Sequence, residues 1–169
     1  MISKCTNRGS VNTTYSDSGG IVGHWRELGG TVAECVNYGE ISTNGNDSDA
    51  GKSRLSIGGI VGSGWINQNN IEINVIRCGN EGYVHGGNTG NMSVAGICGG
   101  FNTNQNKLNL FIADSYNAGM IGNGRGERAS GITAGAGNKK NLDIKLYRLS
   151  LIHIWQQGKD RDQSCTADQ

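Results

Sequence analysis

Short apolar segments separated by glycine and asparagine recur along the 169-residue chain in two alternating motifs. The first motif is Gly-Ile-x-Gly, with alanine ending the fourth copy, and it occurs as GIVG at 20–23, GIVG at 59–62, GICG at 96–99 and GITA at 131–134. The second motif is C/S-x-N-x-G-x-V/I, and it occurs as CTNRGSV at 5–11, CVNYGEI at 35–41, CGNEGYV at 78–84 and SYNAGMI at 115–121. This strict alternation predicts a repeat protein whose units stack on one another.

Aliphatic β-branched residues hold fixed places around the second motif. They lie three positions before and six positions after its cysteine or serine, at Ile2, Val32, Val75, Ile112 and at Val11, Ile41, Val84, Ile121. Such residues favour strands, so each unit is expected to form short strands before the cysteine, after the glycine and at Gly-Ile-x-Gly. The pattern predicts an all-β fold of about four stacked coils with parallel strands and almost no helix. Surface loops are expected where the units differ in length, at 42–54, 63–72, 85–92 and 100–109.

Asparagine and glycine occupy matching positions in every copy of the second motif, at Asn7, Asn37, Asn80, Asn117 and at Gly9, Gly39, Gly82, Gly119. An asparagine side chain can satisfy the backbone of a turn, and glycine can adopt the positive φ of tight turns. We therefore expect glycines with positive φ and asparagines stacked as an amide ladder. The leading glycines of the first motif are also predicted to be structural positions, namely Gly20, Gly59, Gly96 and Gly131.

The residue before each cysteine or serine alternates in charge, in the order Lys4, Glu34, Arg77, Asp114. Units stacked about 4.8 Å apart would turn this column into a ladder of opposite charges, each pair contributing roughly 0.2–1 kcal/mol. The aliphatic position three residues before the cysteine and the cysteine itself have opposite strand parity. Both can face the interior only if a bend or bulge lies between them, and we expect such a bend.

GGIVG at 19–23, followed by GTVAECVNYGEI at 30–41, resembles the GLUG repeat of large bacterial surface and secreted proteins. Such repeats occur in the non-catalytic part of immunoglobulin A-cleaving metallopeptidases. The resemblance extends from residue 2 to about 148 and weakens in the fourth unit, where Ser115 replaces cysteine and Ala134 replaces glycine. It implies a right-handed parallel β-helix outside a bacterium, and it implies no chemistry, because the motif residues are structural. The H-E-x-x-H zinc motif of those peptidases is absent from the sequence.

Composition supports the same fold class. The chain has 29 glycines, no proline and 35% hydrophobic residues, and each glycine inside a helix would cost roughly 0.5–1 kcal/mol. A net charge of +1 and a pI near 7.6 give no electrostatic case for a nucleic-acid partner. No apolar stretch approaches the roughly 20 residues of a membrane span.

The segment LSLIHIW at 149–155 breaks the pattern. A fifth copy of the second motif would begin at Ser150, with asparagine at 152 and glycine at 154, but both positions hold isoleucine. LSLIHI is also encoded by one reading frame of a common transposase adapter, so residues 149–169 are predicted to be a non-native or disordered tail from adapter read-through. The alternative is a divergent last strand with a polar tail. Residues 1–148 are then the repeat domain, expected to be a fragment of a longer protein.

Cysteine and histidine are not arranged for catalysis or metal binding. No C-x2-C pair occurs among Cys5, Cys35, Cys78, Cys98 and Cys165, and three of these share a repeat position with serine, which favours small buried residues. Disulfides or a metal site are the alternatives. The histidines His24, His85 and His153 fall at unrelated positions. We predict no catalytic residue, no metal and no cofactor.

Two loops and three aromatic residues are candidate ligand sites. NGNDSDAGK at 44–52 has oxygen ligands but lacks the glutamate of a calcium loop, and GNGRGER at 122–128 opens no helix after a strand. Both are interpreted as ordinary turns. Trp25, Trp65 and Phe101 follow the first motif by two or three residues. They either cover an edge of the core or stack on sugar rings.

These observations predict a non-catalytic structural or adhesive segment of a bacterial cell-surface or secreted protein. Its expected partners are the neighbouring repeats of the full-length protein, with host or cell-wall glycans as candidate ligands. The alternative is a carbohydrate-binding or carbohydrate-active β-helix. An enzyme of that kind needs acids in one column of adjacent units. Glu34 and Asp114 share a column but have Arg77 between them, and Glu40 aligns with no other acid.

Overall fold

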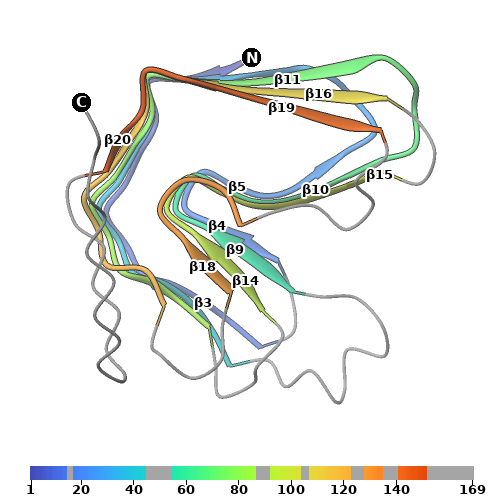
Figure 1. The fold of residues 1–169 in the computed structure, drawn as a ribbon. Coiled ribbons are helices and arrows are strands. Elements are labelled where there is room, and N and C mark those ends of the chain that lie inside the picture. The colour runs from blue at the N-terminus through green and yellow to red at the C-terminus, as the bar shows by residue number, and fades with distance from the viewer. Residues whose placement is uncertain are drawn as a thin grey trace, which may run out of the picture.

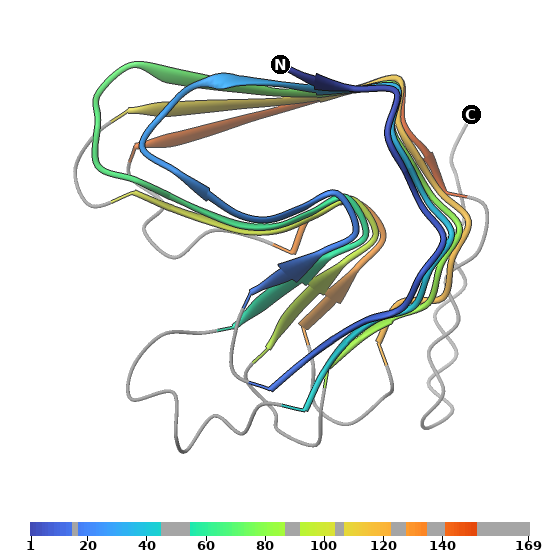
Figure 2. The same cartoon turned by 180° about the vertical axis from the view of Figure 1, so that it is seen from behind.

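The computed structural model describes residues 1–14, 17–44, 55–86, 92–103, 107–122, 128–134 and 141–151. Within these residues the protein is all-β, with no helix, and every strand pairing is parallel. Figures 1 and 2 show equivalent strands lying side by side along one axis. This arrangement is consistent with a β-helix.

In the described residues, twenty strands form five parallel sheets. Sheet A orders β1 (Ile2–Ser3), β6 (Gly30–Ala33), β11 (Ile71–Ile76), β16 (Leu108–Ala113) and β19 (Leu142–Tyr147). Sheet B orders β2 (Thr6–Asn7), β7 (Val36–Asn37), β12 (Gly79–Asn80), β17 (Tyr116–Asn117) and β20 (Ser150–Leu151). Sheet C contains β3 (Val11–Thr13), β8 (Ile41–Thr43) and β13 (Val84–His85), and sheet D contains β4 (Ser18–Gly19), β9 (Ser56–Gly58), β14 (Ser93–Ala95) and β18 (Arg128–Ser130). Sheet E contains β5 (Val22–Arg26), β10 (Val61–Ile66) and β15 (Cys98–Thr103).

The chain passes through the sheets in the order A, B, C, D, E and then returns to sheet A. We call each passage a coil, so that coils 1 to 5 begin at β1, β6, β11, β16 and β19. The register joins equivalent repeat positions, pairing Val32 with Val75 and Val75 with Ile112. The columns of the sequence repeat are therefore the columns of the sheets.

The bend expected before the cysteine is present in each coil. Between sheets A and B the chain turns at a single non-glycine residue with left-handed φ of 47–56°, at Lys4, Glu34, Arg77, Asp114 and Arg148. One left-handed residue reverses the alternation of side chains between the two sides. Val32 and Cys35 consequently both face the interior, each with 0% exposure.

The glycines of the second motif do not have the positive φ predicted from the sequence. Among the described glycines, positive φ occurs at Gly30 (158°) and Gly122 (80°), neither of which belongs to this motif. Glycine is needed at these positions because adjacent coils approach closely: a Cβ on Gly39 would lie 2.0 Å from the carbonyl oxygen of Gly9, and one on Gly82 would lie 2.0 Å from that of Gly39. The prediction failed because contact between coils, and not turn conformation, excludes a side chain here.

The core is divided into two clusters. One lies between sheets A and E and includes Ile73, Ile97 and Phe101, and the other lies between sheets C and D and includes Ile41 and Val94. Between them the corner joining sheets D and E turns inward against sheet B (Figures 1 and 2). The leading glycines of the first motif sit at this contact, as shown next for Gly59.

Gly59 lies directly against the amide of Asn80. A Cβ on Gly59 would lie 2.4 Å from Asn80 Cγ and 2.2 Å from the carbonyl oxygen of Gly96. Gly20 and Gly96 meet Asn37 and Asn117 in the same way. The two sequence motifs therefore touch each other across the interior, the leading glycine of one coil against the asparagine of the following coil.

Two of the four expected surface loops are largely strand. Residues 63–72 contain most of β10 and the start of β11, and residues 100–109 contain most of β15 and the start of β16. The extra residues lengthen sheets A and E, because their apolar side chains, such as Ile66 and Leu108, are buried between these sheets. Most of 42–54 and 85–92 lies outside the described residues.

The segment that breaks the repeat begins inside the fold. Leu149 packs against the cluster between sheets A and E, and β20 pairs Ser150 with Tyr116 and Leu151 with Asn117. Leu149 thus occupies the cysteine column and Leu151 the asparagine column. Residues 152–169, which include His153 and Cys165, lie outside the described residues.

Candidate functional site

The recurrent asparagines form a continuous ladder of side-chain hydrogen bonds. Nδ2 of Asn7 donates to Oδ1 of Asn37 at 2.8 Å, Asn37 donates to Asn80 at 2.7 Å, and Asn80 donates to Asn117 at 2.7 Å. Each Nδ2 also donates to the carbonyl of the glycine two residues later, at 2.9–3.0 Å. Asn37, Asn80 and Asn117 are fully buried. Their amides hold adjacent coils together and do not face solvent.

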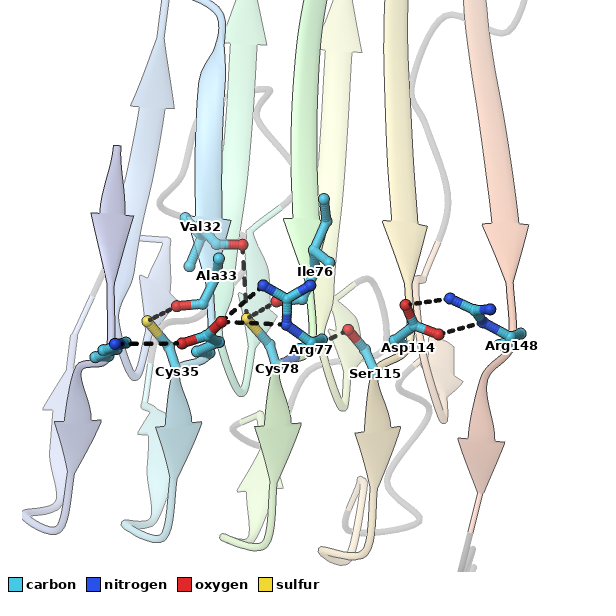
Figure 3. A network of polar contacts seen from close by, with 11 residues as sticks. Val32, Ala33, Cys35, Ile76, Arg77, Cys78, Asp114, Ser115 and Arg148 are labelled. Atoms are coloured by element: carbon cyan, nitrogen blue, oxygen red, sulfur yellow. Dashed lines mark hydrogen bonds and ion pairs between the residues drawn. The ribbon is translucent and has the colours of Figure 1, made fainter.

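The charged column at the corner between sheets A and B forms ion pairs between coils (Figure 3). Arg77 Nη2 lies 2.7 Å from Glu34 Oε1, and Lys4 Nζ lies 4.0 Å from the other oxygen of Glu34. Arg148 extends the alternation into coil 5, where it forms a two-nitrogen contact with Asp114. The hydrogen bond and charge of Arg77 lower the pKa of Glu34, and those of Arg148 lower the pKa of Asp114.

Three of the described cysteines lie in environments that suppress thiolate chemistry, whereas Cys5, predicted to be buried, is exposed because no coil precedes it in the structure. Cys35, Cys78 and Cys98 are buried, and burial raises the pKa of Cys78 to about 11 and also raises the pKa values of Cys35 and Cys98. Protonated thiols are weak nucleophiles and weak metal ligands. In the part of the chain that the structure describes, no group of three or more His, Cys, Asp or Glu side chains could hold a metal ion.

The three aromatic residues considered for sugar stacking do not form one surface. Phe101 is 1% exposed within the core, and Trp25 shares its column, packs against the same core and donates Nε1 to the carbonyl of Leu28 at 2.6 Å. Trp65 lies one position further along sheet E, paired with Arg26 and Asn102, and donates Nε1 to Asn67. Phe101 is thus closed to sugar stacking, while Trp25 and Trp65 are both half-buried and lie in different columns.

One polar cluster brings together side chains from two coils. Asp17 Oδ2 lies 3.0 Å from His24 Nδ1 and accepts a 2.6 Å hydrogen bond from Ser63 Oγ, which lies 2.7 Å from the same His24 nitrogen. Asp17 Oδ1 accepts from the backbone nitrogen of Ser56 at 2.8 Å. The cluster lies where sheets D and E fold toward each other, and Ser63 is only 3% exposed.

Sequence reasoning missed this cluster, although a signal was available. Asp17 and Ser56 both lie three residues before a leading glycine of the first motif, and His24 and Ser63 both lie four residues after one. Stacking of equivalent positions therefore brings the flanks of the motif together between coils. What the sequence did not show was the inward corner that turns these two flanks toward each other.

The geometry of this cluster does not suit a catalytic triad. A triad places the carboxylate on one imidazole nitrogen and the serine on the other, so that the histidine can take the serine proton. Here Asp17 and Ser63 both contact Nδ1, and the Ser63 hydroxyl donates directly to the carboxylate. The arrangement is a partly exposed polar link between coils 1 and 2, in which Asp17 accepts from the Ser63 hydroxyl and from the backbone of Ser56.

Searches against protein-family models, curated proteins and solved structures found no match to this chain. The resemblance to the GLUG repeat therefore stays a prediction. No helix in the described residues is long and apolar enough to cross a membrane. The sequences at 44–52 and 122–128 lie almost entirely outside the described residues.

Proposed function

We propose that this chain is a non-catalytic structural or adhesive repeat segment of a bacterial cell-surface or secreted protein, built as a right-handed parallel β-helix of about four full coils. The observation that carries the proposal is that the recurrent residues are used in contacts between coils. The asparagines bond to one another, the glycines admit the neighbouring backbone, and the charged corner residues pair. Neighbouring repeats of a longer protein are the partners that such surfaces fit.

The positions of the acids argue against the alternative of a carbohydrate-active enzyme. Glycoside hydrolysis uses two carboxylates that face each other across one substrate bond. Glu34 and Asp114 each pair with an arginine, and Glu40 lies 2.9 Å from Nε2 of His85. Each of these contacts, in the described part of the chain, joins a carboxylate to a basic side chain, and none brings two carboxylates together.

The location is tested on cells that produce the protein. An antibody raised against the folded chain is expected to label intact cells or the culture medium as strongly as it labels permeabilised cells. Labelling that requires permeabilisation would refute a surface or secreted location. A cytosolic protein of the same cells serves as the control for membrane integrity.

The absence of catalysis is tested separately by incubating the purified chain with a panel of neutral and acidic polysaccharides and measuring reducing ends. No release above the buffer level is expected. Release that is lost in both Glu34→Gln and Asp114→Asn would contradict the proposal and identify the acids responsible.

A further inference from the structure

The outer face of sheet B carries an aromatic and charged cluster that the structural role of the repeat does not use. Thr6, Val36, Gly79 and Tyr116 are paired neighbours in this sheet, and each precedes an inward-facing ladder asparagine. Side chains alternate along a strand, so these four positions face outward. The next outward positions are Arg8, Tyr38, Glu81 and Ala118, one residue beyond each asparagine.

Tyr116 lies flat on this face because its neighbour in coil 3 has no side chain. A Cβ on Gly79 would lie 2.3 Å from Cε1 and Cζ of the Tyr116 ring. The phenol oxygen of Tyr116 donates to Glu81 Oε1 at 2.8 Å, which fixes the far end of the ring. Partial burial and this carboxylate raise the pKa of Tyr116 to about 12. The ring is thereby held with one face on the sheet and the other facing outward.

Further groups with hydrogen-bonding capacity share this face. Tyr38 is 40% exposed and lies two residues beyond Val36, which is paired with Gly79 in sheet B. The guanidinium of Arg8 stacks on Tyr38 at 4.6 Å from the ring centroid. One flat aromatic ring is therefore accompanied by a carboxylate, a guanidinium and a second phenol, all exposed at least in part.

We propose that Arg8, Tyr38, Glu81 and Tyr116, together the tyrosine face, bind a neutral glycan. The apolar C–H face of one pyranose stacks on the flat ring of Tyr116 and its hydroxyls donate to Glu81, while the following sugar units lie along sheet B toward Tyr38 in coil 2 and Arg8 in coil 1. Binding sites commonly combine an aromatic surface with a few polar groups that orient the ligand. Arg8 and Glu81 balance in charge, so this face offers no net attraction to a polyanion.

This inference rests on the adhesive role proposed above and places it at a defined site. It differs from stacking at Trp65, a half-buried member of the aromatic set predicted from sequence. The two sites lie on different sheets, B and E. Substitutions at Trp65 and Tyr116 therefore test the two positions independently.

The test measures binding affinity by isothermal titration calorimetry of the folded chain with cello-, chito-, manno- and galacto-oligosaccharides. We expect at least one to bind, Tyr116→Ala to weaken binding about tenfold through the lost stacking, and Glu81→Gln to weaken it several-fold. Trp65→Ala is the matched control and should bind like the parent chain. Circular dichroism establishes that each variant is folded. If Tyr116→Ala does not fold, Tyr116→Leu and the chemical-shift changes of Tyr38 and Arg8 on titration replace it.

Three outcomes overturn the proposal. They are no binding of any oligosaccharide at millimolar concentration, loss of binding in Trp65→Ala with Tyr116→Ala unaffected, and binding of a polypeptide such as gelatin, but no glycan, through Tyr116. None of these outcomes bears on whether cells expose the protein, and failed surface labelling would not alter a measured affinity. The two proposals can therefore fail separately.

Discussion

The buried amides of Asn37 and Asn80 show how single residues maintain the stack. Each accepts from the preceding coil, donates to the next one and donates to the turn carbonyl of its own coil. A buried amide that loses these partners keeps the cost of its own desolvation. Removing one amide therefore also leaves groups unsatisfied in the coils on either side.

Replacing Asn80 with alanine is expected to lower the free energy of unfolding by about 1–3 kcal/mol, because partners in coils 2 and 4 lose their hydrogen bonds. Chemical denaturation measures the change. Asn74→Ala is the control, because the Asn74 amide donates to the exposed carboxylate of Glu72 and takes no part in the ladder. An Asn80→Ala chain as stable as the parent would contradict the structural role of the ladder.

The first and last glycines of the Gly-Ile-x-Gly motif can be compared for their tolerance of a side chain. A Cβ on Gly59 would overlap backbone and the amide of Asn80, at 2.2–2.4 Å, whereas one on Gly23 would meet its nearest atom at 3.6 Å. Gly59→Ala is expected to destabilise by about 1–3 kcal/mol or more through overpacking, and Gly23→Ala to have little effect. Thermal unfolding of both variants checks this, and equal shifts would show that close approach is not the reason for glycine at 59.

Tyr116 is expected to ionise in a late step near pH 12 in a titration of tyrosinate absorbance. Since its pKa is raised above the usual value of 10, its contribution to stability is complete below pH 10 and is lost as the pH rises through about 12. Glu81→Gln should lower this pKa, and Tyr116→Phe should remove the late step. A late step that persists in Tyr116→Phe would assign it to another residue.

Predictions for single residues were correct where equivalent positions of adjacent coils touch each other. They were wrong where the residue type depends on something other than that contact. The amide ladder and the charged column follow from stacking alone, and both are present. The positive φ assigned to Gly39 and Gly82 was wrong because the left-handed residue is instead the charged one before the cysteine. Charged residues seldom adopt this conformation, so composition gave no indication of it.

At the scale of strands, the coils differ most in sheets A and E. The strands before and after the corner between E and A lengthen from coil 1 to coils 2 and 3. Nothing in the spacing of the motifs separates a longer strand from a longer loop, and residues 63–72 and 100–109 were therefore assigned to loops. The alternation of Ile71, Ile73 and Val75 was the available signal.

Sheet B offers a test of whether the ladder can be extended. Asn117 pairs with Leu151, which is 51% exposed and cannot accept from Nδ2 of Asn117. Leu151→Asn supplies an acceptor and is expected to be more stable than the control Leu151→Ala by about 0.5–1.5 kcal/mol, the net worth of a hydrogen bond. The denaturant midpoints of the two variants measure this difference in stability. Equal midpoints would show that the ladder does not continue into β20.

At the scale of the whole molecule, the contact between Gly59 and Asn80 separates two hydrophobic clusters. Sequence periodicity identified the apolar columns but could not show which sheets share a core, because that depends on the inward corner. The cluster of Asp17, His24 and Ser63 was missed for the same reason. Each of the two hydrophobic clusters continues along the axis of the stack and is lined by its own set of strands.

This division predicts how core substitutions combine. Ile112→Ala and Val94→Ala lie in different clusters, so their effects on unfolding should add within about 0.3–0.5 kcal/mol. Ile112→Ala and Val75→Ala lie on paired positions of one cluster and should deviate from additivity by about 0.5 kcal/mol or more. A double-mutant cycle by chemical denaturation measures both. Equal coupling in the two pairs would mean that the clusters behave as one core.

The hydrogen bonds of the amide ladder all run in one direction along the stack. Each Nδ2 donates to the Oδ1 of the following coil, from Asn7 through Asn37 and Asn80 to Asn117. The dipoles of these amides therefore add instead of cancelling, and each bond polarises the next. The ladder carries partial negative charge at its Asn7 carbonyl and partial positive charge at its Asn117 amino group, so the stack is electrically polar along its axis.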